Sequence, residues 1–207
     1  MNLLDRLICE FDRGLRTILA SPQAARPSPA QTLSGAVPAE DREAAIRLMR
    51  IDHCGEVCAQ ALYQGQALVA RSPEIRTVLQ NASREEQDHL AWCEQRLNDL
   101  GGRKSLFNPF WYAGSFGLGL VSGTLGDKWS MAFLVETERQ VERHIDDHLQ
   151  RLPASDVKSR RVLEVMREDE IRHGDSGEKH GAATLPPPIK AAMRLMSRVM
   201  TRSTYWI

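Results

Sequence analysis

The pattern Glu-x-x-His occurs twice in this chain, as Glu86-Gln-Asp-His89 and as Glu170-Ile-Arg-His173. In a helix, residues three positions apart lie on one face, with Cβ atoms about 5–6 Å apart. The residues at helical spacing around each pair are apolar or small, so we expect both pairs to face the interior. Buried charges need partners or a metal. The fold must therefore bring two distant helices together around these four side chains.

The composition predicts an all-α protein with a substantial core. The 207 residues suffice for one large domain or two small ones, and 42% of them are hydrophobic. Runs of Ala, Leu, Glu, Arg and Gln, with few β-branched alternations, favour helices. The 27 basic and 27 acidic residues cancel, so no net field attracts nucleic acid, and we expect no nucleic-acid partner.

The four cysteines indicate a reducing compartment. None lies in a Cys-x-x-Cys motif, and the N-terminal stretch carries Asp5, Glu10 and Asp12 where a secretory signal would be apolar. We therefore expect free thiols and a cytoplasmic protein. Cys54 and Cys58 are four residues apart and could share a metal on a helix, but we interpret them as small core residues.

Helical periodicity and helix-ending residues divide the chain into segments. We expect an amphipathic helix at 1–20 and a linker rich in Pro, Ala and Ser at 21–39. Four long helices are predicted at about 40–70, 73–100, 128–152 and 155–182. Their ends are marked by the cap and first helical residue Ser72-Pro73, the stop Gly101-Gly102, Pro153, and the run Pro186-Pro187-Pro188.

Two further segments have unusual compositions. Residues 106–125 carry no charge, and a run of this length could span a bilayer. Asn108-Pro109 and four glycines, however, make this segment a poor membrane helix. We expect a crossover that packs on the bundle or lies in a membrane interface. Residues 189–207 form a basic amphipathic helix, with Lys190, Arg194, Arg198 and Arg202 four positions apart. This pattern is typical of a membrane-surface helix, and a helix that caps the bundle explains it equally well.

The other two long helices each offer an inward glutamate. Glu56 shares its stripe with Met49, Ala59, Tyr63 and Ala67. On the third long helix, Glu138 and Glu142 both lie among apolar residues at helical spacing, and the periodicity favours Glu138 only modestly. Burying a Glu on the inward stripe of a bundle helix is costly unless its charge is paired or binds a metal.

Together, four glutamates and two histidines predict a site for two metal ions. Two divalent ions would neutralise four buried carboxylates, and oxygen-rich ligands with one imidazole per metal suit iron or manganese. A buried hydrogen-bonded network without metal is the simpler alternative. One Glu from each of two helices and Glu-x-x-His from each of two others is the pattern of ferritin-like di-metal carboxylate proteins. The predicted fold is therefore an all-α, ferritin-like four-helix bundle with an apolar crossover between helices two and three. His144, six residues after Glu138, is expected to support the metal ligands.

Several runs of residues resemble one known family. They are Ile51-Asp-His-Cys-Gly-Glu-Val57, Ala61-Leu-Tyr-Gln-Gly-Gln66, Glu86-Gln-Asp-His89, the pair Glu138 and His144, Asp169-Glu-Ile-Arg-His173, and Gly177-Glu-Lys-His-Gly181. Together they resemble the demethoxyubiquinone hydroxylases, the di-iron enzymes of ubiquinone biosynthesis, over roughly residues 45–205. The sequence before residue 40 resembles the bacterial members.

The resemblance implies a ligand set and an activity. Two irons would be held by Glu56, Glu86, His89, Glu138, Glu170 and His173, with Glu86 and Glu170 bridging both; the ungapped match favours Glu138 over Glu142. The activity implied is an O2-dependent monooxygenase that hydroxylates the ring of a demethoxyubiquinol. Residues 1–39 would then be an N-terminal helix and linker, and residues 40–207 the di-iron catalytic domain with a C-terminal membrane-surface helix. In mitochondrial members a Tyr follows the residue matching His144, whereas this chain has Ile145, so no role of that Tyr carries over.

The resemblance also implies partners. They are a polyprenyl benzoquinol, O2, the cytoplasmic face of the cell membrane as a peripheral contact, and other proteins of ubiquinone biosynthesis; a homo-oligomer is left open. The alternatives are a ferritin-type iron-storage or detoxification protein, a manganese catalase, or another di-metal oxidase. The uncharged crossover and the basic C-terminal helix favour a membrane-facing enzyme over these.

Overall fold

The computed structural model describes residues 3–207, and the side chains of all of these except residues 3, 4, 6 and 7. Within this range the protein consists of helices and their connections, without a strand, which confirms the predicted all-α class. The helices are α1 (Leu3–Leu19), α2 (Ala39–Val69), α3 (Pro73–Leu100), α4 (Asn108–Thr124), α5 (Asp127–Arg151), α6 (Val157–Lys179) and α7 (Pro187–Trp206).

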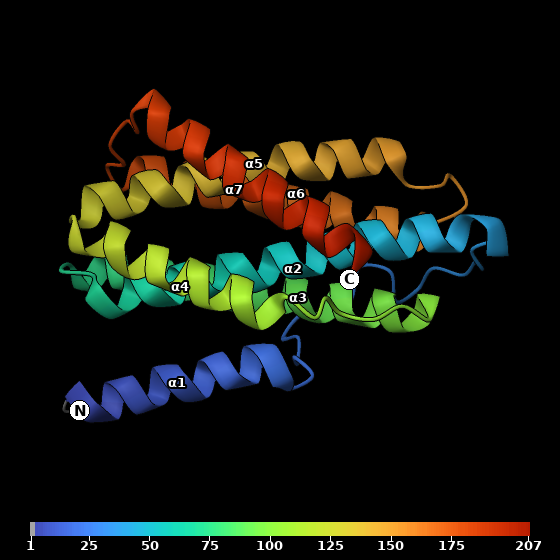
Figure 1. The fold of residues 1–207 in the computed structure, drawn as a ribbon, viewed down its shortest axis with the longest axis horizontal. Helices are drawn as coiled ribbons and strands as arrows, with labels where there is room; N and C mark the ends of the chain where they lie inside the picture. The colour runs from blue at the N-terminus through green and yellow to red at the C-terminus, as the bar shows by residue number, and fades with distance from the viewer. Residues whose placement is uncertain (1–2) are drawn as a thin grey trace.

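Helices α2, α3, α5 and α6 form the predicted four-helix bundle (Figure 1). Its apolar core is divided into two main clusters. One contains Met49, Leu97 and Met166, and the other contains Leu79 and Met131. On α2, α3 and α5 the predicted metal-ligating residues lie between the residues that belong to these two clusters, and on α6 they follow Met166 of the first cluster. The site therefore lies in the middle of the bundle, with an apolar layer on either side along the helix axes.

Local capping explains where the helices begin and end. The Ser72 hydroxyl accepts hydrogen bonds from the backbone N–H groups of Glu74 and Ile75, as the Ser-Pro signal predicts. Gly101 ends α3 in the left-handed region, with φ of 76°. Asp156 caps α6 by accepting from the N–H of Ser159 at 3.0 Å. The predicted boundaries of the long helices are thus confirmed to within a few residues.

The uncharged segment forms helix α4, which packs along α2 (Figure 1). Glycines make this close approach possible. A Cβ atom on Gly119 would lie 2.2 Å from the carbonyl oxygen of Leu62, and one on Gly65 would lie 2.4 Å from that of Phe116. The crossover thus packs on the bundle, which is one of the two arrangements expected for it. Among the helices formed by residues 3–207, none combines the length and the apolar character needed to cross a bilayer.

The N-terminal segment folds back onto the bundle. Helix α1 contacts α2 and α4, and the Thr17 hydroxyl donates to Gln60 at 2.7 Å. In the linker, the Arg26 guanidinium lies over the Trp92 ring and donates to Asp88 at 2.7 Å. The linker therefore covers part of α3. A division of the chain at residue 39 stays a prediction.

Helix α7 lies across α2 and α5, so it covers the bundle (Figure 1). Its residues Met193, Met196 and Met200 line a cavity between the helices, whereas Arg194 and Arg198 are exposed. Near its end, the buried Thr204 hydroxyl lies 3.5 Å from the Cys54 sulfur. All four cysteines are free thiols; the expected core position is confirmed for Cys54, and its neighbour Cys58 is partly buried.

Candidate metal centre

All six predicted ligand residues lie together in the bundle core, and the most exposed of them, His173, is only 7% exposed. Each of the two Glu-x-x-His pairs lies on one side of the cluster, and the two imidazole rings have centroids 6.4 Å apart. The His89 Nδ1 atom is 3.2 Å from carboxylate oxygens of both Glu86 and Glu170. The His173 Nδ1 atom is 3.3 Å from the other Glu86 oxygen. The Nδ1 atoms thus point into the carboxylate cluster.

The six residues divide into two overlapping groups of four. One contains Glu56 and His89, the other contains Glu138 and His173, and Glu86 and Glu170 belong to both. Within each group, one ligand atom from every residue lies within 4.8 Å of the others. Two adjacent metal ions that share two carboxylates would have this arrangement.

The structure separates Glu138 from its rival Glu142. Glu138 is 1% exposed and belongs to the cluster. The Glu142 side chain is 33% exposed, and the Arg167 guanidinium lies 3.9 Å from it. Glu138 therefore lies with the other five predicted ligand residues and Glu142 does not; metal binding by Glu138 stays a prediction.

Many polar atoms in this cluster have no hydrogen-bond partner among the described residues. They are Glu56 Oε2, Glu86 Oε1, Glu138 Oε2, both carboxylate oxygens of Glu170, and His173 Nδ1. Protein interiors satisfy the great majority of buried polar atoms, and each unpaired one costs about 1–3 kcal/mol. Such a concentration of unpaired carboxylate oxygens fits a site built for cations. Oxygen donors with one imidazole per ion suit iron or manganese.

The pKa shifts in the cluster indicate which side chains bind protons when no metal ion is bound. Burial and the neighbouring charge of Glu86 raise the pKa of Glu56 well above its usual value, and burial and Glu170 do the same for Glu138. Burial opposes ionisation of Glu86 as well, but the neighbouring imidazoles of His173 and His89 hold its pKa well below the usual value. The two histidine pKa values are raised by their carboxylate neighbours against the effect of burial. Without metal, bound protons therefore neutralise the buried carboxylates, which two divalent ions could also do.

The two Glu-x-x-His pairs support each other in a way that the sequence analysis missed. The outward nitrogen of His89, Nε2, donates to Asp169 at 2.9 Å, and the corresponding nitrogen of His173 donates to Glu85 at 3.3 Å. Each acceptor is the residue just before the glutamate of the other pair. Such contacts fix the ring orientation of a metal-binding histidine and raise its basicity. The available signal was an acid preceding Glu-x-x-His in both pairs.

Asp169 also ties the linker to the site. The Arg26 guanidinium lies 2.8 Å from its carboxylate, and Arg172 donates to the same group. Burial opposes ionisation of Asp169, but His89 and the two arginines hold its pKa well below the usual value. The carboxylate is therefore charged at neutral pH and is able to orient His89.

Tyr63 is a second supporting residue that the sequence analysis placed only on an apolar stripe. Its buried hydroxyl donates to the Glu138 carboxylate in a short hydrogen bond. Burial and the Glu138 charge raise the pKa of Tyr63 well above its usual value, so the hydroxyl stays protonated. Tyr63 therefore holds the Glu138 carboxylate in one orientation.

We expect Tyr63→Phe to lower the iron affinity of the site by about tenfold, the effect usual for a supporting contact. Competition for Fe2+ against a chromophoric chelator measures this. Tyr112→Phe is a matched control, because the Tyr112 hydroxyl donates at 2.5 Å to Gln64, away from the cluster. Equal affinities for the two variants would contradict the orienting role of Tyr63.

His144 lies outside the cluster. Its polar neighbours are His148, with ring centroids 4.0 Å apart, and Asp52, and its Nε2 atom has no hydrogen-bond partner among the described residues. The expected support of the metal ligands by His144 stays a prediction. His144 and Glu56 do line the same cavity.

That cavity connects the cluster to the helices outside the bundle. It has a volume of about 140 Å³, lies between α2, α4, α5 and α7, and reaches Glu56. Most of its wall is apolar, including Leu62, Leu118 and Met196. A second cavity of about 510 Å³ lies between α1, α2 and α3 and is lined by arginine, glutamine and serine residues. It reaches Tyr63, but none of the six ligand residues lines it.

Comparison of the sequence with known proteins identifies the family to which the chain belongs. A family model described as "Ubiquinone biosynthesis protein COQ7" matches residues 43–204. Proteins named 3-demethoxyubiquinol 3-hydroxylase are similar over nearly their full length. The one from Dechloromonas aromatica (strain RCB) is 55% identical over 202 residues, covering 97% of this chain and 98% of the relative. The one from Nitrosomonas europaea is 55% identical over 206 residues, covering 99% of each chain. The resemblance inferred from the motifs is confirmed, and the storage-protein alternative is not favoured. This chain belongs to the COQ7 family of ubiquinone biosynthesis proteins.

Proposed function

We propose that this chain is a di-iron monooxygenase that uses O2 to hydroxylate the ring of a demethoxyubiquinol. The observation that carries the proposal is the buried box of four glutamates and two histidines at the end of an apolar cavity. The names of the relatives that align over nearly the whole chain support this reaction.

In this proposal Glu56, Glu86, His89 and Glu170 would hold one iron, and Glu86, Glu138, Glu170 and His173 would hold the other. When bound, the iron pair supplies the electrons and open coordination positions that O2 reduction requires. Asp169, Glu85 and Tyr63 keep the ligands in place. The box is neutral with two divalent ions, because four carboxylates offset four positive charges.

The protein's other task is to hold an apolar substrate beside Glu56 and away from water. The cavity wall supplies apolar side chains from α2, α4, α5 and α7, so a quinol ring can leave the bilayer without crossing open solvent. The polyprenyl tail favours an apolar environment by about 0.8 kcal/mol per buried CH2 group. The ring therefore enters while the tail remains in lipid. The larger polar cavity beneath α1 is unsuited to such a molecule.

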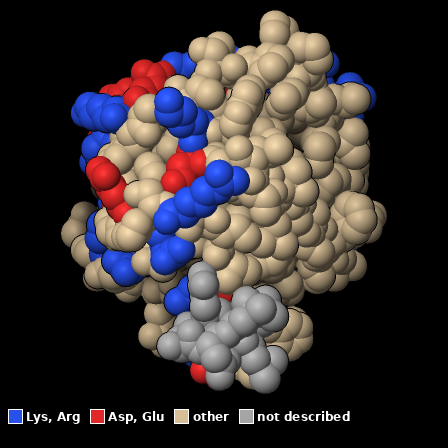
Figure 2. Space-filling view, turned by 90° about the vertical axis from the view of Figure 1, so that its left-hand side faces the viewer, with Lys and Arg blue, Asp and Glu red and all other residues tan. Residues whose placement is uncertain are grey.

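We further propose that α4 and α7 contact the cytoplasmic surface of the cell membrane. Large apolar side chains are exposed on both, among them Phe110 at 68% and Leu195 at 61%. These helices lie toward the viewer in Figure 1, and Figure 2 shows a broad area without charged side chains on that side of the molecule. Arg194, Arg198 and Arg202 are exposed on α7, where they can meet anionic lipid headgroups.

Replacing Arg194, Arg198 and Arg202 together with glutamate tests this contact. Each arginine near an anionic surface contributes about 1 kcal/mol, so we expect binding to weaken by about 100-fold. Sedimentation with phosphatidylglycerol-containing vesicles measures it. The control changes Arg151, Arg161 and Lys179 to glutamate, which alters net charge equally on exposed positions of α5 and α6. Equal binding of the two variants would rule α7 out as the anchor.

The proposed reaction is tested by oxygen uptake with the iron-loaded protein and a reductant. We expect uptake that depends on demethoxyubiquinol, with a product heavier by one oxygen atom. Mass measurement of the assembly in the same preparation addresses the storage alternative. A cage-sized soluble assembly that consumes oxygen only in proportion to added Fe2+ would refute the hydroxylase proposal.

A further inference from the structure

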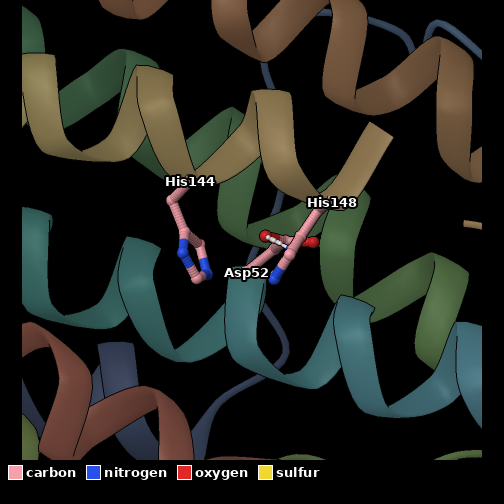
Figure 3. A group of neighbouring side chains, drawn as sticks. All are labelled: Asp52, His144 and His148. Atoms are coloured by element: carbon pink, nitrogen blue, oxygen red, sulfur yellow. Dashed lines mark hydrogen bonds and ion pairs between the residues drawn. The ribbon is translucent and has the colours of Figure 1, made fainter. Parts of the chain in front are cut away.

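A second cluster of metal-ligating side chains lies outside the six-residue box. Asp52 is one helical turn before Glu56 on α2, and His144 and His148 are four residues apart on α5. Residues at that spacing lie on one face of a helix. Figure 3 shows both imidazole rings extending from α5 toward α2; the His148 ring meets the Asp52 carboxylate, and the His144 ring lies to one side of it. Asp52 is 4% exposed, His148 is fully buried, and His144 is partly buried at the cavity wall.

The three side chains are close enough to share one ion. The His148 Nδ1 atom is 2.7 Å from an Asp52 oxygen. One ligand atom from each of the three residues lies within 4.8 Å of the others. In a tetrahedral zinc site, bonds of about 2.0–2.2 Å place the ligand atoms roughly 3.3–3.6 Å from one another. Small side-chain rotations therefore suffice to close the three atoms around one ion.

Each of the three residues also has a buried atom without a hydrogen-bond partner among the described residues. These atoms are Asp52 Oδ2, His144 Nε2 and His148 Nε2. A structural Asp52–His148 ion pair alone uses one oxygen and one nitrogen, and it leaves one buried polar atom on each of the three residues without a partner. Burial and the neighbouring His148 lower the pKa of His144 to about 4. His144 is therefore neutral at pH 7, the state in which an imidazole binds a metal.

We propose that Asp52, His144 and His148 form a separate mononuclear site for a divalent transition-metal ion of the Zn2+ type. Two imidazoles and one carboxylate are the donor set of many zinc sites that retain an open coordination position. The donors are richer in nitrogen than those of the six-residue box, so the two sites differ in metal preference. Asp52 and His144 line the apolar cavity, which gives the ion a path of entry. Such an ion links α2 to α5 and occupies the cavity wall near Glu56.

The test is zinc binding by the iron-loaded protein. Zn2+ is titrated against a chromophoric chelator, and zinc and iron are counted by atomic emission in the same dialysed samples. We expect the wild type to bind one zinc per chain while keeping its iron. His148→Gln and His144→Gln are expected to lose this zinc at concentrations that saturate the wild type, again with iron retained. His180→Gln, on a partly exposed histidine at the end of α6, is the matched control and should bind zinc normally.

The outcomes are distinct. Zinc that only replaces iron in the wild type, or no zinc at all, would overturn the proposal. So would zinc binding by both cluster variants at the wild-type level. If His148→Gln fails to fold, His144→Gln decides the matter, because His144 Nε2 makes no hydrogen bond that the substitution would break. The result is independent of the hydroxylase proposal, since it is read from metal counts and not from turnover.

Discussion

Replacing Glu86 with glutamine is expected to abolish binding of the iron pair and, with it, quinol-dependent oxygen uptake. Glu86 is one of the two residues that belong to both groups of ligands, so its loss affects both metal positions. Glutamine keeps the size of the side chain but removes its charge, which leaves two divalent ions among three carboxylates. Losing even a residue that only supports a ligand costs 10–100-fold in affinity, so we expect at least a 100-fold loss here. Iron per chain, measured after desalting, gives the result directly.

Glu142→Gln is the matched control for this variant. Glu142 lies four residues after Glu138 on the same helix and satisfied the same periodicity, but its side chain is partly exposed and lies outside the cluster. We expect the Glu142 variant to keep two irons per chain and normal oxygen uptake. A Glu86 variant that retained full iron would overturn the site. Iron loss in the Glu142 variant would instead indicate that Glu142, and not Glu138, is the ligand supplied by α5.

Much of this site could be predicted because its information is local to each helix. The inward direction of Glu86 and His89 follows from the apolar residues around them at helical spacing. The helix ends follow from Ser72, Gly101 and Asp156, whose capping contacts involve residues only a few positions away. Charge balance then indicated that inward carboxylates on four helices must meet at a cation site.

The remaining features depend on how the helices are placed relative to one another. The contacts from His89 to Asp169 and from His173 to Glu85 require one particular offset of α3 relative to α6 along the bundle axis. No local sequence pattern encodes this offset. Arg26 was expected in a linker, yet its guanidinium reaches Asp169 beside the site. The place of His144 beside Asp52 likewise depends on how α5 lies against α2, which the sequence does not encode locally. Periodicity gives the direction of a side chain, and only packing gives its partner.

The contact between α4 and α2 leads to the largest stability effect that we expect from a single added methyl group. Gly119→Ala would place a Cβ atom 2.2 Å from the Leu62 carbonyl oxygen and 3.1 Å from the Gln66 backbone nitrogen. Both are backbone atoms of α2, so no side chain can rotate to relieve the clash, and the two helices must move apart. Overpacking of this kind costs about 1–3 kcal/mol or more, and we expect about 3 kcal/mol. For a domain of this size, that lowers the Tm by roughly 6–12 °C.

Gly114→Ala on the same helix separates this clash from the intrinsic effect of the substitution. Gly114 is exposed, and a Cβ atom there meets nothing within 4 Å, so alanine should stabilise the helix by up to about 1 kcal/mol. Thermal unfolding of both variants without added iron therefore gives Tm shifts of opposite sign. Because α4 also supplies Trp111, Ser115 and Leu118 to the cavity wall, the Gly119 variant should in addition show a raised KM for the quinol. A Tm for Gly119→Ala equal to that of wild type would mean that α4 does not pack on α2 through this glycine.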